Sequence, residues 1–151
     1  MYKARIQRRS AFTLIEILMV AAILAVLAAF AVPALMKQGV RAKMDLCRAT
    51  ILRNGPIAKG LTNFRFDVGR YPETSEGLEA LFEIPSGIDE DSGKWQGPYM
   101  EGTLEELRDP WQQEFHYVSP GEFHEDSYDL WSVGPDDDDG TDDDIKNWRE
   151  T

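Results

Sequence analysis

The residues with the clearest capacity for chemistry are the aspartates near the C-terminus. Seven aspartates occupy the nine positions from Asp136 to Asp144, and Gly140 lies among them. Calcium is bound by roughly six to eight oxygen atoms from carboxylates and backbone carbonyls, which an acidic loop can supply. The EF-hand pattern does not fit, because placing Gly140 at its central glycine puts Pro135 first and Lys146 last. Composition alone favours the simpler interpretation, a solvated acidic run.

A second unusual carboxylate is Glu16, the only charged residue in the apolar run 12–36. An ionised carboxylate in hydrocarbon is unfavourable by several kcal/mol unless it finds a partner. Two interpretations remain open on composition alone. Glu16 either lies near the membrane surface and reaches the lipid headgroups, or it pairs with a cation on another chain.

The run that contains Glu16 is long enough to span a membrane. At about 1.5 Å per residue, the 25 residues of 12–36 exceed a hydrocarbon core of roughly 30 Å. The apolar core of a cleaved secretory signal is shorter, at about 7–15 residues. Basic residues lie on both sides of the run, within 1–11 and within 37–43, so the positive-inside rule alone does not set its orientation. We expect a spanning helix with its N-terminus inside the cell, because the acidic stretch 71–151 is domain-like and domains translocate largely regardless of charge.

Charge is distributed unevenly along the 151 residues, whose net charge is −11. Residues 1–11 carry +4, residues 37–70 carry +6, and residues 71–151 carry −20. A chain this acidic is a poor general partner for nucleic acid. Its single cysteine, Cys47, cannot form an intramolecular disulfide. No hydrolase elbow, zinc-protease motif, P-loop or dinucleotide fingerprint is present, so we expect no enzymatic activity.

The elements that position these carboxylates follow from periodicity. An apolar stripe through Val40, Met44, Cys47 and Ile51 predicts that a helix continues through 37–69, interrupted at Gly55-Pro56. Residues 70–151 predict a small α+β head. It would contain a short helix over 75–82, a loop over 83–100, and strands over 114–119 and 127–133 packed on the long helix. We expect the four tryptophans to seal its core: Trp95, Trp111, Trp131 and Trp148.

The stretch Ala11-Phe12-Thr13-Leu14-Ile15-Glu16 resembles the class III signal of type IV pilins and pseudopilins. In that family a prepilin peptidase removes a basic leader just before a Phe, whose new amine is then methylated. The resemblance implies that residues 1–11 are cleaved between Ala11 and Phe12, and that Phe12 is N-methylated. It also implies that Glu16 pairs with the terminal amine of a neighbouring subunit. The family usually has Gly where this chain has Ala11.

The head resembles the major pseudopilins of type II secretion systems more specifically. The motifs that carry the resemblance occur in order: Tyr71 to Leu78, Gly97-Pro98-Tyr99, Asp109-Pro110-Trp111, Tyr117 to Gly121, Tyr128-Asp129-Leu130, Gly134-Pro135-Asp136 and Asn147-Trp148. The family usually has Gly where this chain has Gln112, which we expect to alter one turn. The resemblance implies a pilin-like α+β fold, in which a long N-terminal helix packs on a small antiparallel sheet.

The implied function is a structural subunit that polymerises into a periplasmic pseudopilus for protein export. The implied organisation is a cleaved leader 1–11, a transmembrane and assembly helix 12–36, a periplasmic continuation 37–69 and a head 70–151. The chain would cross the bacterial inner membrane once, with the head in the periplasm. Implied partners are further copies, minor pseudopilins, the inner-membrane secretion machinery and prepilin peptidase. Two alternatives are a subunit of a type IV or competence pilus and a monomeric membrane-anchored calcium-binding module.

The resemblance also favours calcium binding in the acidic loop 133–145, because major pseudopilins of this type bind calcium there. Matching the family pattern implies carboxylate ligands from Asp136, Asp143 and Asp144. Asp137 and Asp138 remain alternative ligands, because the acidic run is so redundant. Backbone carbonyls near Val133 and Thr141 would complete the site.

Overall fold

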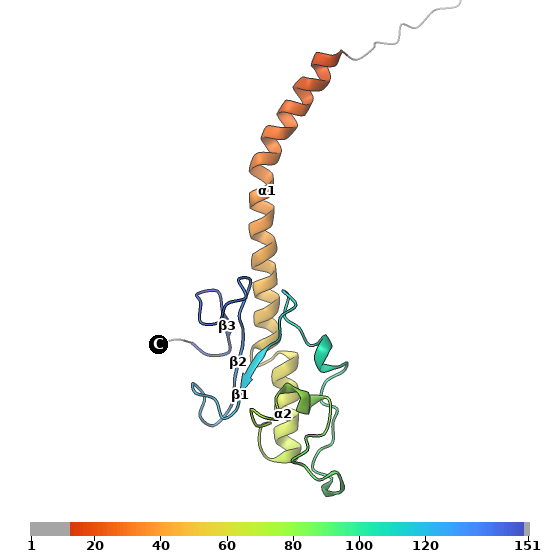
Figure 1. The fold of residues 1–151 in the computed structure, drawn as a ribbon, viewed down its shortest axis with the longest axis vertical. Helices are drawn as coiled ribbons and strands as arrows, with labels where there is room; N and C mark the ends of the chain where they lie inside the picture. The colour runs from red at the N-terminus through yellow and green to blue at the C-terminus, as the bar shows by residue number, and fades with distance from the viewer. Residues whose placement is uncertain (1–12, 150–151) are drawn as a thin grey trace, which may run out of the picture. The chain divides into compact units, whose positions relative to one another are not determined.

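The computed structural model describes residues 13–149, which divide into two compact units between Gly39 and Val40 (Figure 1). The order of elements is α1 (Leu14–Ile51), α2 (Pro56–Val68), the 3-10 helices η1 (Leu78–Leu81), η2 (Glu90–Ser92) and η3 (Leu104–Glu106), then β1 (His116–Val118), β2 (Asp129–Ser132) and β3 (Ile145–Lys146).

The described part of the first unit is the apolar portion of α1. Its large apolar side chains are 52% to 79% exposed: Leu14, Ile15, Ile17, Leu18, Met19, Val20, Ile23, Leu24, Val26, Leu27, Phe30, Val32, Leu35 and Met36. By length and composition, the described residues contain one helix able to cross a membrane, and it lies near the N-terminus. A helix that is apolar all round is stable where lipid or other helices surround it.

The second unit begins in the last turns of α1 and continues into α2. The helices separate at Gly55-Pro56, as predicted. The backbone is so close there that a Cβ on Gly55 would lie 2.1 Å from the carbonyl oxygen of Thr50, so the break needs glycine. Pro56 is then favourable as the first residue of α2, where no intrahelical N–H bond is needed. Gly69 ends α2 in the left-handed conformation, with φ of 90°, and its N–H donates to the carbonyl of Arg65.

Three short strands form an antiparallel sheet in the order β1-β2-β3. β1 and β2 lie within the two predicted strands, with Tyr117 opposite Leu130. β3 was not predicted, since two residues show no alternation. The predicted helix 75–82 is a shorter 3-10 turn, η1, and the predicted loop 83–100 contains η2.

The core joins both helices to the sheet. Its fully buried side chains include Cys47 and Ile51 from α1, Leu61 and Phe64 from α2, and Leu130 from β2. Phe64 contacts the edge of Tyr99, with ring centroids 5.6 Å apart. Burial of this apolar surface is the main favourable contribution to folding of the head.

The prediction that all four tryptophans seal the core is wrong for two of them. Trp95 and Trp111 pack against the core and are partly buried. Trp131 and Trp148 instead meet edge to face at 5.7 Å, outside that cluster. They extend a series of rings, because Trp131 stacks on His116 and Trp148 stacks on Phe123. The strand alternation places Trp131 on the opposite side of β2 from the buried Leu130.

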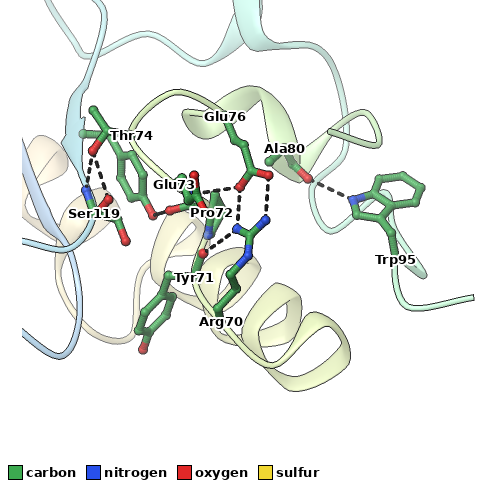
Figure 2. Close-up of polar contacts among 10 residues, drawn as sticks. Arg70, Tyr71, Pro72, Glu73, Thr74, Glu76, Ala80, Trp95 and Ser119 are labelled. Atoms are coloured by element: carbon green, nitrogen blue, oxygen red, sulfur yellow. Dashed lines mark hydrogen bonds and ion pairs between the residues drawn. The ribbon is translucent and has the colours of Figure 1, made fainter. Parts of the chain in front are cut away.

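A polar network fixes the segment that follows α2 (Figure 2). The Arg70 guanidinium donates to both carboxylate oxygens of Glu76, at 2.5 and 2.7 Å, and also to the carbonyl of Tyr71. This bidentate pairing with Arg70 lowers the pKa of Glu76 below its usual value. The Thr74 hydroxyl donates to the carbonyl of Ser119 and accepts from its N–H.

A buried carboxylate supports the other side of the head. Asp109 is 1% exposed and accepts hydrogen bonds from the hydroxyl of Ser132 and from two backbone N–H groups, those of Trp111 and Gln113. Ser132 in turn lies beside Cys47, where burial raises the pKa of the thiol. This cluster connects β2 to α1 and to the Asp109-Pro110-Trp111 turn.

Candidate functional site

The first candidate site is the start of α1. Ala11 and Phe12, the predicted cleavage and methylation residues, lie outside the described residues. Glu16 is the third residue of the helix. Its backbone N–H donates to Thr13 at both the hydroxyl, 3.3 Å away, and the carbonyl, 3.1 Å away. Thr13 thus acts as the N-cap of α1.

The side chain of Glu16 is exposed and forms no ion pair with any residue of the described range 13–149. A carboxylate in the first turn is stabilised by the helix dipole. Sequence reasoning missed this local role, although Thr13-Leu14-Ile15-Glu16 follows the Thr-x-x-Glu pattern of a capping box. The geometry leaves the Glu16 carboxylate available to a cation from outside the chain.

The second candidate site is the acidic segment, which connects β2 to β3. Because these strands pair, with Ser132 opposite Ile145, the two ends of the connection lie together. Gly134 has φ of 77°, and a Cβ there would lie 2.6 Å from the carbonyl oxygen of Asp143. Glycine therefore permits the close approach that closes this loop.

Asp136, Thr141 and Asp143 come together at this closure. The Thr141 hydroxyl donates to Asp143 at 2.7 Å, and this bond is the main reason that the pKa of Asp143 lies below its usual value. Hydrogen bonds from Asp136 act in the same direction. Asp136 also accepts from the N–H of Asp138 at 3.2 Å, which is an Asx turn.

Asp144 has a buried carboxylate, since its side chain is only 1% exposed. Its Oδ2 accepts from the N–H of Gly140 at 3.0 Å and lies 3.4 Å from Nζ of Lys146. Its Oδ1 is buried and has no hydrogen-bond partner within the described residues. An unsatisfied buried carboxylate oxygen is unfavourable, and a bound cation would satisfy it.

Val133, the fifth predicted ligand residue, is buried at the start of the loop. Within residues 13–149, no group of three or more His, Cys, Asp or Glu side chains is arranged to hold a metal ion. The donor chemistry nevertheless fits calcium, because the loop offers carboxylate, hydroxyl and carbonyl oxygens and an unpartnered oxygen on Asp144. Sequence reasoning missed Asp139, which accepts from the indole N–H of Trp131 at 2.9 Å.

Known family models match both the N-terminal helix and the head. The family described as "Type II secretion system (T2SS), protein G" matches residues 34–148. The prokaryotic N-terminal methylation motif matches residues 6–32, which include Glu16. The two matches together cover the N-terminal apolar run and nearly the whole head.

Individual relatives give the same result. Type II secretion system core protein G of Aeromonas hydrophila is 35% identical over 143 residues, covering 95% of this chain and 94% of the relative. The Pseudomonas aeruginosa protein of the same name is 38% identical over 146 residues, covering 94% and 96%. The crystal structure of the major pseudopilin from the type 2 secretion system of enterohaemorrhagic Escherichia coli is 28% identical, with a TM-score of 0.58, covering 76% of this chain and 93% of that one. The chain belongs to the protein G family of type II secretion systems, the major pseudopilins.

Proposed function

We propose that the chain is anchored in the inner membrane by α1 and polymerises, with its head in the periplasm, into a pseudopilus that drives protein export. The observation that carries this proposal is the exposed apolar helix joined to a methylation motif. Its apolar side chains are stable in lipid before assembly and against neighbouring copies after it. The apolar core of the head needs no such partner, because the head buries it by itself.

Prepilin peptidase would cut before Phe12 and create a positive terminal amine four residues from Glu16. In a bundle of identical helices, the amine of one copy can face the Glu16 carboxylate of the next. Each charge alone is unfavourable in lipid, so pairing them favours one register of the subunits. Thr13 caps the helix through its own oxygen atoms, which leaves the Glu16 carboxylate for this contact.

The proposal is tested by replacing Glu16 with Ala in the full chain, with Glu16→Asp as the matched control. We expect Glu16→Ala to be cleaved and methylated but to form no fibres, because an amine then stays unpaired in lipid. Glu16→Asp should retain part of the assembly. Intact mass after membrane extraction reports processing, and electron microscopy of periplasmic fractions reports fibres.

Other outcomes would favour the alternatives. Long fibres outside cells would indicate a type IV or competence pilus. An unprocessed chain that never self-associates, whatever stands at position 16, would indicate a monomeric membrane-anchored module. Either result would contradict a secretion pseudopilus. The minor pseudopilins and inner-membrane machinery belong to the same proposal, since a fibre of this kind needs both initiation and energy input.

We further propose that calcium binds in the loop 133–145. Asp136, Asp143 and Asp144 would supply carboxylates, with the carbonyls of Val133 and Thr141. Bound calcium would offset the mutual repulsion of seven aspartates and so hold the β2–β3 connection closed. The closed loop ends and the unpartnered Asp144 oxygen support this assignment.

Thermal unfolding of the full chain in detergent tests the calcium proposal. At a calcium concentration about 100 times Kd, binding should stabilise the head by about 2.7 kcal/mol, and chelation should remove that gain. Asp144→Asn should abolish the calcium response, whereas Asp142→Asn, at an exposed position outside the proposed ligand set, should keep it. An equal response in both variants would show that the loop attracts calcium only as a diffuse acidic run.

A further inference from the structure

One face of α2 remains exposed although its composition suits an interface. Lys59, Thr62, Asn63 and Phe66 are all exposed, and their spacing places them on one side of the helix. Phe66 is 88% exposed, more than any other large apolar residue in the described chain, including those of the apolar part of α1. We call these four residues the α2 face.

The fold of a single copy gives Phe66 nothing to pack against. Phe64, two residues earlier, is fully buried against Tyr99, and even the exposed Phe123 stacks on Trp148. Phe66 makes no ring contact within the described residues. Aromatic side chains are enriched at the centres of protein interfaces, where their large apolar area leaves water.

The charge of the α2 face indicates what kind of surface would cover it. The face has one cation, Lys59, and no acidic residue. Lys59 forms no ion pair within residues 13–149. The neighbouring Asp67 does not oppose this charge pattern, because it is directed to the Tyr99 hydroxyl. A partner surface that is acidic and has a small apolar contact would be complementary.

An exposed segment with that chemistry exists on the same chain, residues 83–106. This segment holds seven exposed carboxylates and one basic residue, Lys94. None of the seven forms an ion pair within the described residues: Glu83, Asp89, Glu90, Asp91, Glu101, Glu105 and Glu106. Among them Leu104 is 37% exposed, which supplies an apolar contact beside carboxylates at 101, 105 and 106.

We propose that the α2 face of one copy docks on the acidic segment 83–106 of a neighbouring copy, with Phe66 as the apolar anchor and Lys59 facing its carboxylates. This inference rests on the proposed polymerisation. Two different surfaces of one chain that fit each other make a head-to-tail contact, and repeated head-to-tail contacts generate a helical fibre. The opposite charges of Lys59 and the acidic segment also favour association of further copies over self-paired dimers.

Photo-cross-linking tests the contact directly. The full chain carries p-benzoylphenylalanine in place of Phe66, an aromatic exchange that keeps the anchor. After irradiation of assembled fibres, we expect a cross-linked dimer whose second attachment maps to residues 83–106. The same probe in a Glu16→Ala background should give no dimer, because that chain does not assemble. Fibres that cross-link elsewhere, to another protein or not at all would overturn the docking proposal and leave polymerisation intact.

Paired variants test the chemistry of the contact. Phe66→Ser should lower the amount of fibre about tenfold, as expected for loss of an interface anchor, while Phe66→Leu should retain most of it. Lys59→Glu should weaken assembly, and Glu105→Lys in the same chain should restore it in part. Thermal unfolding of the head should be unchanged in all four, since these side chains are exposed. Normal fibres from Phe66→Ser would contradict the proposal, whereas absence of fibres from the unsubstituted chain would contradict polymerisation itself.

Discussion

The apolar part of α1 and the head use the same apolar residue types in opposite ways. Leu24 in the first unit is 59% exposed, whereas Leu61 in the second is fully buried. In the head, apolar side chains are removed from water by the chain itself. In the apolar part of α1 the chain itself leaves them exposed, so lipid or other copies would have to cover them.

This contrast separates residues that fold the protein from residues that assemble it. The head has a core, a sheet and closed polar networks, which are the properties of a domain with its own stability. The described part of the first unit has a helix and nothing else. Substitutions in the two regions should therefore affect different measurements.

The largest expected effect comes from matched truncations of buried and exposed apolar residues. Phe64→Ala should lower the free energy of unfolding of the head by about 3–5 kcal/mol, because it leaves a cavity beside Tyr99. Leu24→Ala should change it by less than about 0.5 kcal/mol. Denaturant unfolding of the full chain in detergent, followed by tryptophan fluorescence, measures both. Equal losses would mean that the two regions do not differ in this way.

A smaller effect is expected at the Arg70–Glu76 ion pair of the head. The described apolar part of α1 contains no such pair. Glu76→Gln should destabilise the head by about 1.5–3 kcal/mol at neutral pH, through loss of charged hydrogen bonds to Arg70. The folded state lowers the pKa of Glu76, so its contribution is present above the unfolded pKa of about 4.3 and is lost as the pH falls further.

The pH profile therefore distinguishes the two chains. The free energy of unfolding is measured from about pH 6 to about pH 3. It should decline less steeply for Glu76→Gln than for the unsubstituted protein. The control is Glu79→Gln, an exposed neighbour whose side chain accepts no hydrogen bond within the described residues, which should reproduce the original profile. Parallel declines for all three chains would show that Arg70 stabilises the head without involvement of the Glu76 charge.

Features of the fold that depend on local signals could be predicted from the sequence, whereas those that depend on non-local contacts could not. The break at Gly55-Pro56 and the end of α2 at Gly69 were predictable, because glycine and proline act on their own backbone. β3 was not, because Ile145 and Lys146 become a strand only by pairing with β2. The outward direction of Trp131 depends on the same pairing, and sequence reasoning had placed this residue in the core.

The candidate sites divide in the same manner. Glu16 was conspicuous because a carboxylate in an apolar run is unfavourable without a partner. The helix cap at Thr13 was also predictable, because the Thr-x-x-Glu pattern is local to the sequence. In the acidic loop, sequence could not single out Asp144 from its six neighbours. Burial of its side chain distinguishes Asp144. That burial depends on where Gly140 and Lys146 lie once β2 and β3 pair.

The smallest expected effect concerns the backbone of the head. Gln112 has φ of 73°, so it occupies the left-handed conformation that the Asp109-Pro110-Trp111 turn requires. The residue that stands where the family usually has glycine therefore holds a left-handed backbone conformation, which is unfavourable for a side chain with a Cβ. The expected alteration of this turn stays a prediction. Gln112→Gly should stabilise the head by about 0.5–1 kcal/mol, since relief of left-handed strain exceeds the added entropy of the unfolded chain. Gln113→Gly, beside it, has no such strain to relieve and should destabilise the head. Similar stability changes from Gln112→Gly and Gln113→Gly would show that the turn carries no strain.

In α1 the same reasoning reverses, because Gly39 is helical with open space around a Cβ. Gly39→Ala should slow amide exchange in that helical turn and leave unfolding of the head unchanged. Glycine would thus have opposite effects on stability in the two regions.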